Sequence, residues 1–422
     1  MPLQLLSLAQ PTAEMLEDFS LSKLAIPAVS VLIAFLAYTS QYFFLHFESV
    51  PLTRDEVWKI NIFALCIWIC YYRTCFVDPG RLPKAEERPK PKEQEGAALA
   101  SRQRWCRRCE AYKPPRAHHC KTCKRCIPKM DHHCPWTSNC VSHFTIPHFM
   151  RFLFYATVGM SYLETLLWQR ASFVWKSSHL PSYLGPTFGQ LIHLFILLVV
   201  NSLTVFGLFV LLLRSLWALG SNTTTIETWE IERHATLVRR ARVLGGYLEG
   251  PGGIRVHIKK QEYPYDIGIW ANIKQGMGGS ANVISWFWPL AATPDRRSGW
   301  EFEINDFEDP GVSWPPPDPD RIPMPVSARP SNFSMPTDSS KVRVCNVGNH
   351  STIDTKKDDY SETDSESEPD SGGDSDEGEE SWRNAEGERL RDFGVDEEAE
   401  FYDEEDIPLG VLIQRRKQQS NN

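Results

Sequence analysis

The sequence predicts an α-helical integral membrane protein with four transmembrane helices, a cytosolic cysteine-rich domain between helices 2 and 3, and a disordered acidic C-terminal tail. Three observations predict this fold class: two long apolar runs without charge, seven cysteines within residues 106–140, and a change in charge near residue 294. The 422 residues carry a net charge of −8. Residues 295–422 contribute −19, from 14 Lys and Arg against 33 Asp and Glu, so residues 1–294 carry +11.

Four apolar runs predict the membrane spans. The first, Leu24 to Phe47, is charge-free and long enough to cross a hydrocarbon core of about 30 Å. The second, Val57 to Val77, carries charge only near its ends, where long side chains reach the interface. The third, Phe149 to Trp168, is the weakest because it contains an arginine and a glutamate. The fourth lies in the charge-free stretch 177–213 and is the strongest. For the second and third runs, a buried helix of a soluble protein is the alternative.

The charge of the loops predicts the orientation. Residues 81–148 hold 15 Lys and Arg against 6 Asp and Glu, and such an excess marks the cytosolic side of a membrane protein. Four spans then put both termini in the cytosol. Eleven cysteines in 422 residues are too dilute for a disulfide scaffold, and the mildly acidic total argues against a nucleic-acid partner.

These patterns divide the chain into five parts. They are the N-terminus with transmembrane helices 1 and 2 (1–80), the cysteine-rich domain (81–148), transmembrane helices 3 and 4 (149–220), a small cytosolic C-terminal domain (221–293) and the acidic tail (294–422). The composition of the tail is typical of disorder.

The cysteine-rich segment has the spacing of zinc ligands. Three Cys-x-x-Cys pairs occur together with histidines, and a cytosolic compartment favours metal over disulfides. Two tetrahedral sites need eight ligands. Two histidines and six cysteines would supply them, the cysteines being Cys106, Cys109, Cys120, Cys123, Cys126 and Cys140.

That count leaves Cys134, which lies in the sequence Asp131-His132-His133-Cys134. A thiol beside an imidazole suits nucleophilic catalysis, because the thiolate attacks while the imidazole takes the proton. An adjacent carboxylate can orient that imidazole. The alternative is that Cys134 is a redundant or exchanged ninth ligand, and spacing alone favours the catalytic interpretation only slightly.

The segment RWCRRCEAYKPPRAHHCKTCKRCIPKMDHHCPWTSNCV resembles the cysteine-rich domain of DHHC-type protein S-acyltransferases, the palmitoyltransferases. Further family landmarks follow the spans in order: Asp78-Pro79-Gly80, then Thr224-Thr225-Ile226-Glu227, similar to the TTxE motif, and then Tyr265 to Gly268 with Asn272. The resemblance covers roughly residues 20–280. Within the family, the sequence looks most like the fungal endoplasmic-reticulum members. Ser142 and Thr145 depart from the family pattern, which usually has Gly and Asn there, and these departures concern the local turn.

The resemblance implies roles for the site residues. One zinc ion would be bound by Cys106, Cys109, His119 and Cys126, and the other by Cys120, Cys123, His133 and Cys140. Cys134 would be the nucleophile, His132 its base and Asp131 the group that orients His132. Thr225 would support Asp131, and Asn272 would bind backbone groups.

The implied activity is palmitoyl transfer from acyl-CoA, through an acyl-Cys134 intermediate, to cytosolic cysteines of membrane-associated proteins. The cofactors would be two structural zinc ions, with palmitoyl-CoA as acyl donor. The positive loop suits the CoA phosphates, although ordinary membrane topology explains it equally well. The predicted location is the endoplasmic-reticulum membrane, with the Golgi membrane as alternative. Two competing interpretations are a membrane-anchored zinc module for protein binding or ubiquitin transfer and an inactive homologue.

Overall fold

The computed structural model describes residues 24–47, 50–82, 104–179, 181, 185–250, 255–305, 307, 314–316, 318–319, 382–396 and 400–401. Two units divide the chain: Met1–Pro323 with Arg383–Asn422, and Met324–Trp382. All contacts below lie within the first unit. Residues 83–103 and most of the predicted tail lie outside the described residues.

The first apolar run forms a helix in three parts, α2 (Ala25–Ala34), η2 (Phe35–Thr39) and α3 (Ser40–Leu45). In the π-helical middle part, the Thr39 hydroxyl donates to the Phe35 carbonyl at 2.7 Å, and such side-chain bonds compete with the helix backbone. Helix α4 (Arg54–Phe76) follows and begins with a capping box between Thr53 and Glu56. It covers almost all of the second predicted span.

The third and fourth predicted spans lie in two longer helices, α6 (Ile146–Lys176) and α7 (Phe188–Ser221). Helix α6 continues eight residues beyond the predicted end at Trp168. It can do so because the buried Arg170 guanidinium donates to the carbonyls of Val50, at 3.2 Å, and Leu166, at 3.1 Å, so its polar groups are satisfied without water.

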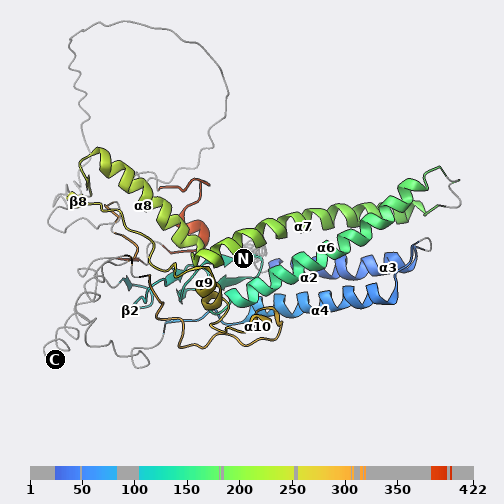
Figure 1. Cartoon of the computed structure of the whole chain (residues 1–422), viewed down its shortest axis with the longest axis horizontal. Helices are drawn as coiled ribbons and strands as arrows, with labels where there is room; N and C mark the ends of the chain where they lie inside the picture. The colour runs from blue at the N-terminus through green and yellow to red at the C-terminus, as the bar shows by residue number, and fades with distance from the viewer. Residues whose placement is uncertain are drawn as a thin grey trace, which may run out of the picture. The chain divides into compact units, whose positions relative to one another are not determined.

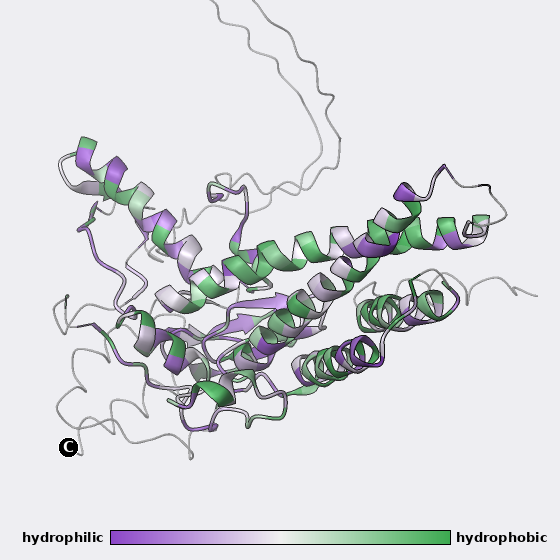
Figure 2. Ribbon diagram, turned by 45° about the vertical axis from the view of Figure 1, so that its right-hand side comes forward, coloured by the Kyte–Doolittle hydropathy of each residue, from purple (hydrophilic) through white to green (hydrophobic). Residues whose placement is uncertain are grey.

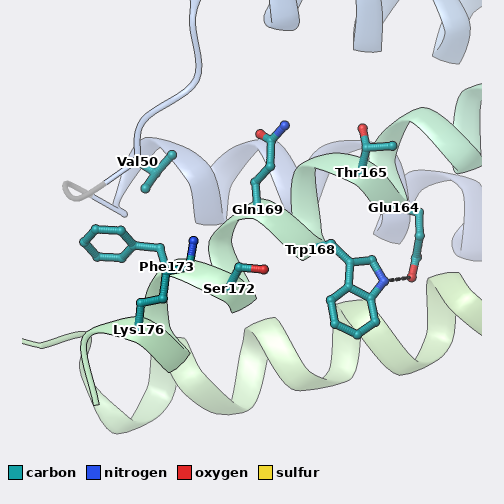
Figure 3. A pocket seen from close by; sticks show the side chains of 8 residues that line it. All are labelled: Val50, Glu164, Thr165, Trp168, Gln169, Ser172, Phe173 and Lys176. Carbon is teal, nitrogen blue, oxygen red and sulfur yellow. Dashed lines mark hydrogen bonds between the residues drawn. The ribbon is translucent and has the colours of Figure 1, made fainter. Parts of the chain in front are cut away.

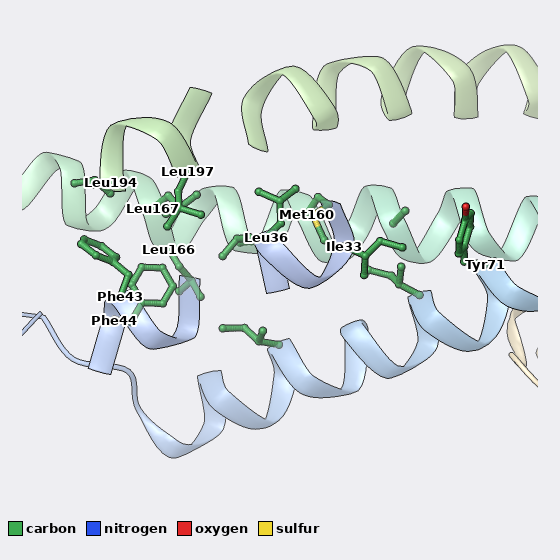
Figure 4. Packing of buried hydrophobic residues seen from close by; sticks show 14 of the residues in the cluster. Ile33, Leu36, Phe43, Phe44, Tyr71, Met160, Leu166, Leu167, Leu194 and Leu197 are labelled. Carbon is green, nitrogen blue, oxygen red and sulfur yellow. The ribbon is translucent and has the colours of Figure 1, made fainter. Parts of the chain in front are cut away.

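These helices run side by side (Figure 1). Their apolar core is drawn from all of them, as Figure 4 shows. Its labelled members are Ile33, Leu36, Phe43, Phe44, Tyr71, Met160, Leu166, Leu167, Leu194 and Leu197.

Helix α7 is apolar along most of its length (Figure 2). Leu203 and Phe206 on α7 are 68% and 70% exposed, and a helix that is apolar all round needs an apolar environment. Among the described residues, Ala25–Leu45 and Phe188–Ser221 are long and apolar enough to cross a membrane.

The glutamate in α6 has polar partners on α7. Glu164 accepts hydrogen bonds of 2.6 Å from the Asn201 amide and 2.6 Å from the Ser202 hydroxyl. A polar side chain between apolar helices is costly unless it is paired. The pairing explains how the weakest apolar run still packs among the other helices.

Three short β-hairpins lie at one end of the helices, between α4 and α6 in the chain (Figure 1). They contain the cysteine-rich segment. The strands are β1 (Trp105–Cys106) with β2 (Ala111–Tyr112), β3 (His118–Cys120) with β4 (Arg125–Ile127), and β5 (His132–Cys134) with β6 (Asn139–Val141).

The segment after α7 forms a small mixed region. It contains α8 (Thr225–Val243), the hairpin β7 (Tyr247–Glu249) and β8 (Arg255–His257), and the short helices α9 (Ile269–Gly276) and α10 (Val283–Phe287). Helix α9 packs on α7 and α10 packs on α6. Asn272 of α9 donates to the Gly220 carbonyl at 2.7 Å, so the prediction that it binds backbone groups is confirmed.

The described residues beyond 294 differ from the expected disorder. Helix η9 (Leu390–Phe393) and strand β9 (Glu400–Phe401) are formed there, and β9 pairs with β1. The Arg233 guanidinium also binds the Asp318 carboxylate at 2.9 Å. The difference arises because composition averaged over the tail hides a few apolar residues, such as Leu390, that can be buried.

Candidate active site and metal centres

Two groups of cysteine and histidine side chains are formed by the three hairpins. Within each group, all ligand atoms lie within 4.8 Å of one another. The groups are Cys106, Cys109, His119, Cys126 and Cys120, Cys123, His133, Cys140. These are the two sets that the family resemblance implies. The β3–β4 hairpin contributes to both groups, so the two centres join the three hairpins into one body.

The strand register explains this arrangement. Residues His119 and Cys126 are directly opposite in the β3–β4 hairpin, as are His133 and Cys140 in the β5–β6 hairpin. Because successive side chains of a strand point to opposite faces, Cys134 points away from its neighbour His133. The candidate ligand His133 and the surplus cysteine Cys134 therefore lie on opposite faces of one short strand.

The geometry fits a tetrahedral zinc ion. The Nδ1 atom of His119 lies 3.4 Å from Cys106 Sγ and 3.3 Å from Cys109 Sγ. The Nδ1 atom of His133 lies 3.6 Å from Cys120 Sγ and 3.5 Å from Cys123 Sγ. Zinc–sulfur and zinc–nitrogen bonds of about 2.3 and 2.0 Å place tetrahedral ligands roughly 3.5 to 3.8 Å apart. Both groups are thus suited to zinc in ligand type and spacing.

Cys134 and His132 lie on the other face of β5, and Asp131 immediately precedes the strand. The His132 ring interacts electrostatically with the Cys134 thiol, and its Nδ1 lies 2.6 Å from Asp131 Oδ2. Asp131 in turn accepts two hydrogen bonds from Thr225, 2.8 Å from the backbone amide to Oδ1 and 3.0 Å from the hydroxyl to Oδ2. Hydrogen bonds thus link Thr225 to Asp131 and Asp131 to His132, and the prediction that Thr225 supports Asp131 is confirmed.

The electrostatics of this chain favour charge separation. Burial opposes ionisation of Cys134, but its hydrogen bond with His132 and the charge of that ring hold the thiol pKa below its ordinary value. Burial also opposes a charged His132, yet hydrogen bonds to Asp131 and Cys134 raise its pKa to about 10. The arrangement therefore favours a thiolate beside an imidazolium, the reactive form of a cysteine nucleophile.

A buried ionic network, which the sequence analysis missed, joins the hairpins to α8. The Arg116 guanidinium forms two hydrogen bonds with the Glu227 carboxylate, from Nε at 2.6 Å and from Nη2 at 2.8 Å. The two side chains are 1% and 2% exposed. The Asn222 side chain accepts from Lys129 Nζ at 2.6 Å. Glu227 is two residues from Thr225, so this network holds the start of α8 against the hairpins.

No pattern in the sequence identified this pairing. Burial opposes ionisation of Glu227, but Arg116 and Tyr263 keep its pKa below the ordinary value. The only available signal was the family's TTxE motif, which marks Glu227 but not its partners.

Apolar side chains surround Cys134 on the side of the helices. Its cluster includes Val141, Phe149 and Leu153, and Leu208 and Leu212 of α7 pack against it. The cysteine residue is 5% exposed. Its sulfur therefore lies where the hairpins meet the ends of α6 and α7.

Ser142 and Thr145, which depart from the family pattern, complete a hydrogen-bonded turn. The Thr145 hydroxyl donates to the Cys140 carbonyl at 2.7 Å and accepts from the Ser142 amide at 2.8 Å. The Ser142 hydroxyl donates to the Pro79 carbonyl at 2.8 Å. Both side chains are fully buried. The turn beyond the last ligand is thus intact with these residues.

An open pocket of about 610 Å³ lies on α6, far along the chain from the hairpins (Figure 3). Glu164 accepts a hydrogen bond of 3.0 Å from the Trp168 ring there. No residue of either cysteine–histidine group lines this pocket. We therefore do not connect it with the chemistry of Cys134.

Comparison with known proteins agrees with this site. Residues 100–232 match the family model described as DHHC palmitoyltransferase. The chain is 65% identical to Palmitoyltransferase pfa4 of Aspergillus fumigatus over 424 aligned residues, which cover 95% of this chain and 99% of that protein. It is 65% identical to Palmitoyltransferase pfa4 of Emericella nidulans, covering 94% and 97%. Identity to Palmitoyltransferase PFA4 of Gibberella zeae is 39%, covering 93% and 95%.

Proposed function

Because the chain belongs to the DHHC palmitoyltransferase family and is a protein S-palmitoyltransferase, we propose that Cys134 is the residue that carries the acyl group. The observation that supports this most directly is the hydrogen-bonded chain from Thr225 through Asp131 to His132, whose ring interacts with the Cys134 thiol. The other six cysteines of the hairpins lie in the two metal-binding groups.

The first proposed step transfers the acyl group from acyl-CoA to the enzyme. The Cys134 thiolate attacks the thioester carbonyl, a bond forms between its sulfur and the acyl carbon, and the bond to the CoA sulfur breaks. The departing CoA thiolate takes the proton held by His132. The positive charge of the 81–148 segment suits the phosphates of CoA.

The second proposed step transfers the acyl group to a cytosolic cysteine of a membrane-associated protein. His132, now neutral, takes the proton of the target thiol. The target sulfur attacks the acyl carbon and Cys134 leaves as a thiolate, which restores the starting state. Because both steps exchange one thioester for another, catalysis depends on positioning and on formation of the thiolate.

Asp131 and Thr225 would act through His132. A carboxylate at Nδ1 fixes the ring so that its other nitrogen faces the thiol, and it stabilises the imidazolium. The hydroxyl and amide of Thr225 fix the carboxylate in turn. We regard Asp131 and Thr225 as positioning residues.

We propose that each of the two cysteine–histidine groups holds one structural zinc ion, with its own four residues as the ligands. Four protein ligands complete a tetrahedron, so no open position remains for substrate. The metal would supply folding energy to hairpins that have little apolar core. Strand β5 would then present Cys134 in a fixed orientation.

The apolar residues around Cys134 support a binding route for the acyl chain between the ends of α6 and α7. A chain of about 16 carbons gains about 0.8 kcal/mol for each buried CH₂, so an apolar environment is required. Phe149 and Leu153, which cluster with Cys134, and Leu212, which packs against that cluster, would provide it.

The finer membrane arrangement is also a proposal. We propose that α2–α3, α4, α6 and α7 are four spans, that the hairpins and both termini are cytosolic, and that the protein resides in the endoplasmic-reticulum membrane, with the Golgi membrane as alternative. The basic balance of residues 81–148 supports the orientation. The domain boundaries follow those of the sequence analysis, except that part of the region beyond 294 belongs with the hairpins.

The experiment that tests the proposal uses labelled palmitoyl-CoA with the purified full chain. The unaltered protein and Cys66→Ser, a control on α4, should both acquire hydroxylamine-labile label. Cys134→Ser should acquire none while retaining its zinc content. Label that persists in Cys134→Ser would exclude Cys134 as the acyl carrier, whereas absence of label in all three proteins would favour a purely structural zinc module.

A further inference from the structure

The C-terminal region contains a segment that lies across the cysteine–histidine hairpins. We call residues 383–396 together with strand β9 (Glu400–Phe401) the C-terminal strap. Although it follows a long acidic stretch of sequence, the strap belongs to the same structural unit as the hairpins. No part of the acyl-transfer mechanism uses it.

The strap bonds to the backbone of ligands from both metal groups. The Asp396 amide donates to the carbonyl of His119 at 2.9 Å, in the first group, and Val395 forms a bridge with Cys120, in the second. The register of β9 on β1 sets Glu400 opposite Cys106. The strap therefore extends the hairpin sheet, in the way that a peptide adds to an exposed strand edge.

Buried side chains and charge pairs fix the strap in place. Leu390, Phe393 and Val395 are 1%, 6% and 1% exposed. The Asp396 carboxylate lies 2.6 Å from Arg108 Nε, in the turn between the first two cysteines. The Trp229 ring of α8 donates to the Glu388 carbonyl at 3.2 Å. The strap thus joins α8 to both metal groups.

One glycine of the strap makes an especially close approach. Gly394 has φ +82°, and a Cβ added there would lie 2.8 Å from the Cβ of His133. Gly387 has nearly the same backbone angle, φ +81°, but open space around it. Any other residue is strained at such angles, so only the steric conflict with His133 distinguishes the two positions.

We propose that the C-terminal strap is an intramolecular peptide ligand of the hairpins, and that its docking holds the two zinc centres closed. Its binding surface is the edge of β1 that does not pair with β2, together with the backbone of β3 next to both groups. The occupant is this chain's own C-terminal segment. The inference rests on zinc occupancy of the two groups, but it does not depend on the identity of the nucleophile.

The first test compares Gly394→Ala with Gly387→Ala in the purified full chain. We expect zinc transfer to a chromogenic chelator to become roughly tenfold faster in Gly394→Ala, the factor that corresponds to about 1.4 kcal/mol. Gly387→Ala should stay within about twofold of the unaltered protein. Hydrogen exchange at the amides of Lys121 and Asp396, which bond across the interface, should accelerate only in Gly394→Ala.

A second test separates strap release from a direct effect on His133. A chain truncated after residue 382 should lose zinc as fast as Gly394→Ala, whereas a chain truncated after residue 401 should behave like the full chain. A synthetic peptide of residues 383–401, added to the shorter chain, should restore slow zinc release in a saturable manner.

Equal zinc release and equal exchange at Lys121 in the two truncated chains would overturn the proposal. So would failure of the peptide to slow zinc release. Loss of palmitoylation in Cys134→Ser has no bearing on these outcomes, so failure of the strap and failure of the nucleophile assignment are distinguishable.

Discussion

Replacing Thr225 by valine tests the positioning chain that ends at Cys134. The change removes the hydroxyl that donates to Asp131 at 3.0 Å while keeping the shape of the side chain. The backbone amide of Thr225 still donates to the other carboxylate oxygen at 2.8 Å. The variant therefore removes one hydrogen bond to a charged group and leaves the second.

The magnitude follows from that single bond. A hydrogen bond to a charged group contributes about 1.5–3 kcal/mol, which corresponds to roughly a 10- to 150-fold change in rate. We expect acyl-enzyme formation to slow by about tenfold, at the lower end, because the remaining amide bond still holds Asp131. Single-turnover reaction with labelled palmitoyl-CoA measures this rate.

Two further variants control the result. In Thr228→Val the lost hydroxyl donates only to the Thr224 carbonyl of the same helix, so acylation should keep its normal rate. Thr225→Ser restores the hydroxyl and should recover most of the rate. Equal rates in the unaltered protein and Thr225→Val, or an equal loss in Thr228→Val, would refute the positioning role.

Three other perturbations have clear expected outcomes. Glu227→Gln leaves a buried arginine without its counter-ion and should lower the free energy of unfolding by about 3–5 kcal/mol. The control Glu249→Gln removes a charge from an exposed pair and should change that free energy by less than about 1 kcal/mol. Thermal unfolding of the two variants measures the difference. Gly80→Ala should destabilise by about 1–3 kcal/mol because a Cβ would lie 2.7 Å from a phenylalanine ring, while Gly245→Ala meets nothing within 4 Å. Removing zinc with a chelator, or replacing Cys126 by serine, should abolish acylation and increase protease cleavage of the hairpins; a metal-free protein with normal activity would contradict the structural role of zinc.

Much of the site was predictable because its signals are local in sequence. The spacing of the Cys-x-x-Cys pairs and the order of residues from Asp131 to Cys134 are visible directly in the sequence. Because side chains alternate along a strand, this order places His133 and Cys134 on opposite faces. The first and fourth spans were predictable for a similar reason, since absence of charge over a whole run is visible without knowledge of packing.

The features that were missed depend on pairs distant in sequence. Nothing near Arg116 indicates that Glu227, 111 positions away, is its partner. The same holds for Glu164, whose partner Asn201 lies on the next helix. The docked strap was hidden for a different reason: Leu390, Phe393 and Val395 are too few to change the average composition of an acidic region, although their burial decides its structure.

Mapping the acyl adduct by mass spectrometry is the most direct test of the central claim. The full chain would be reacted briefly with palmitoyl-CoA, quenched in acid and digested, and the modified cysteine identified. The account predicts an adduct on Cys134 and none on Cys140 or the other five cysteines proposed to bind zinc. An adduct on one of those ligands, with Cys134 unmodified, would contradict it.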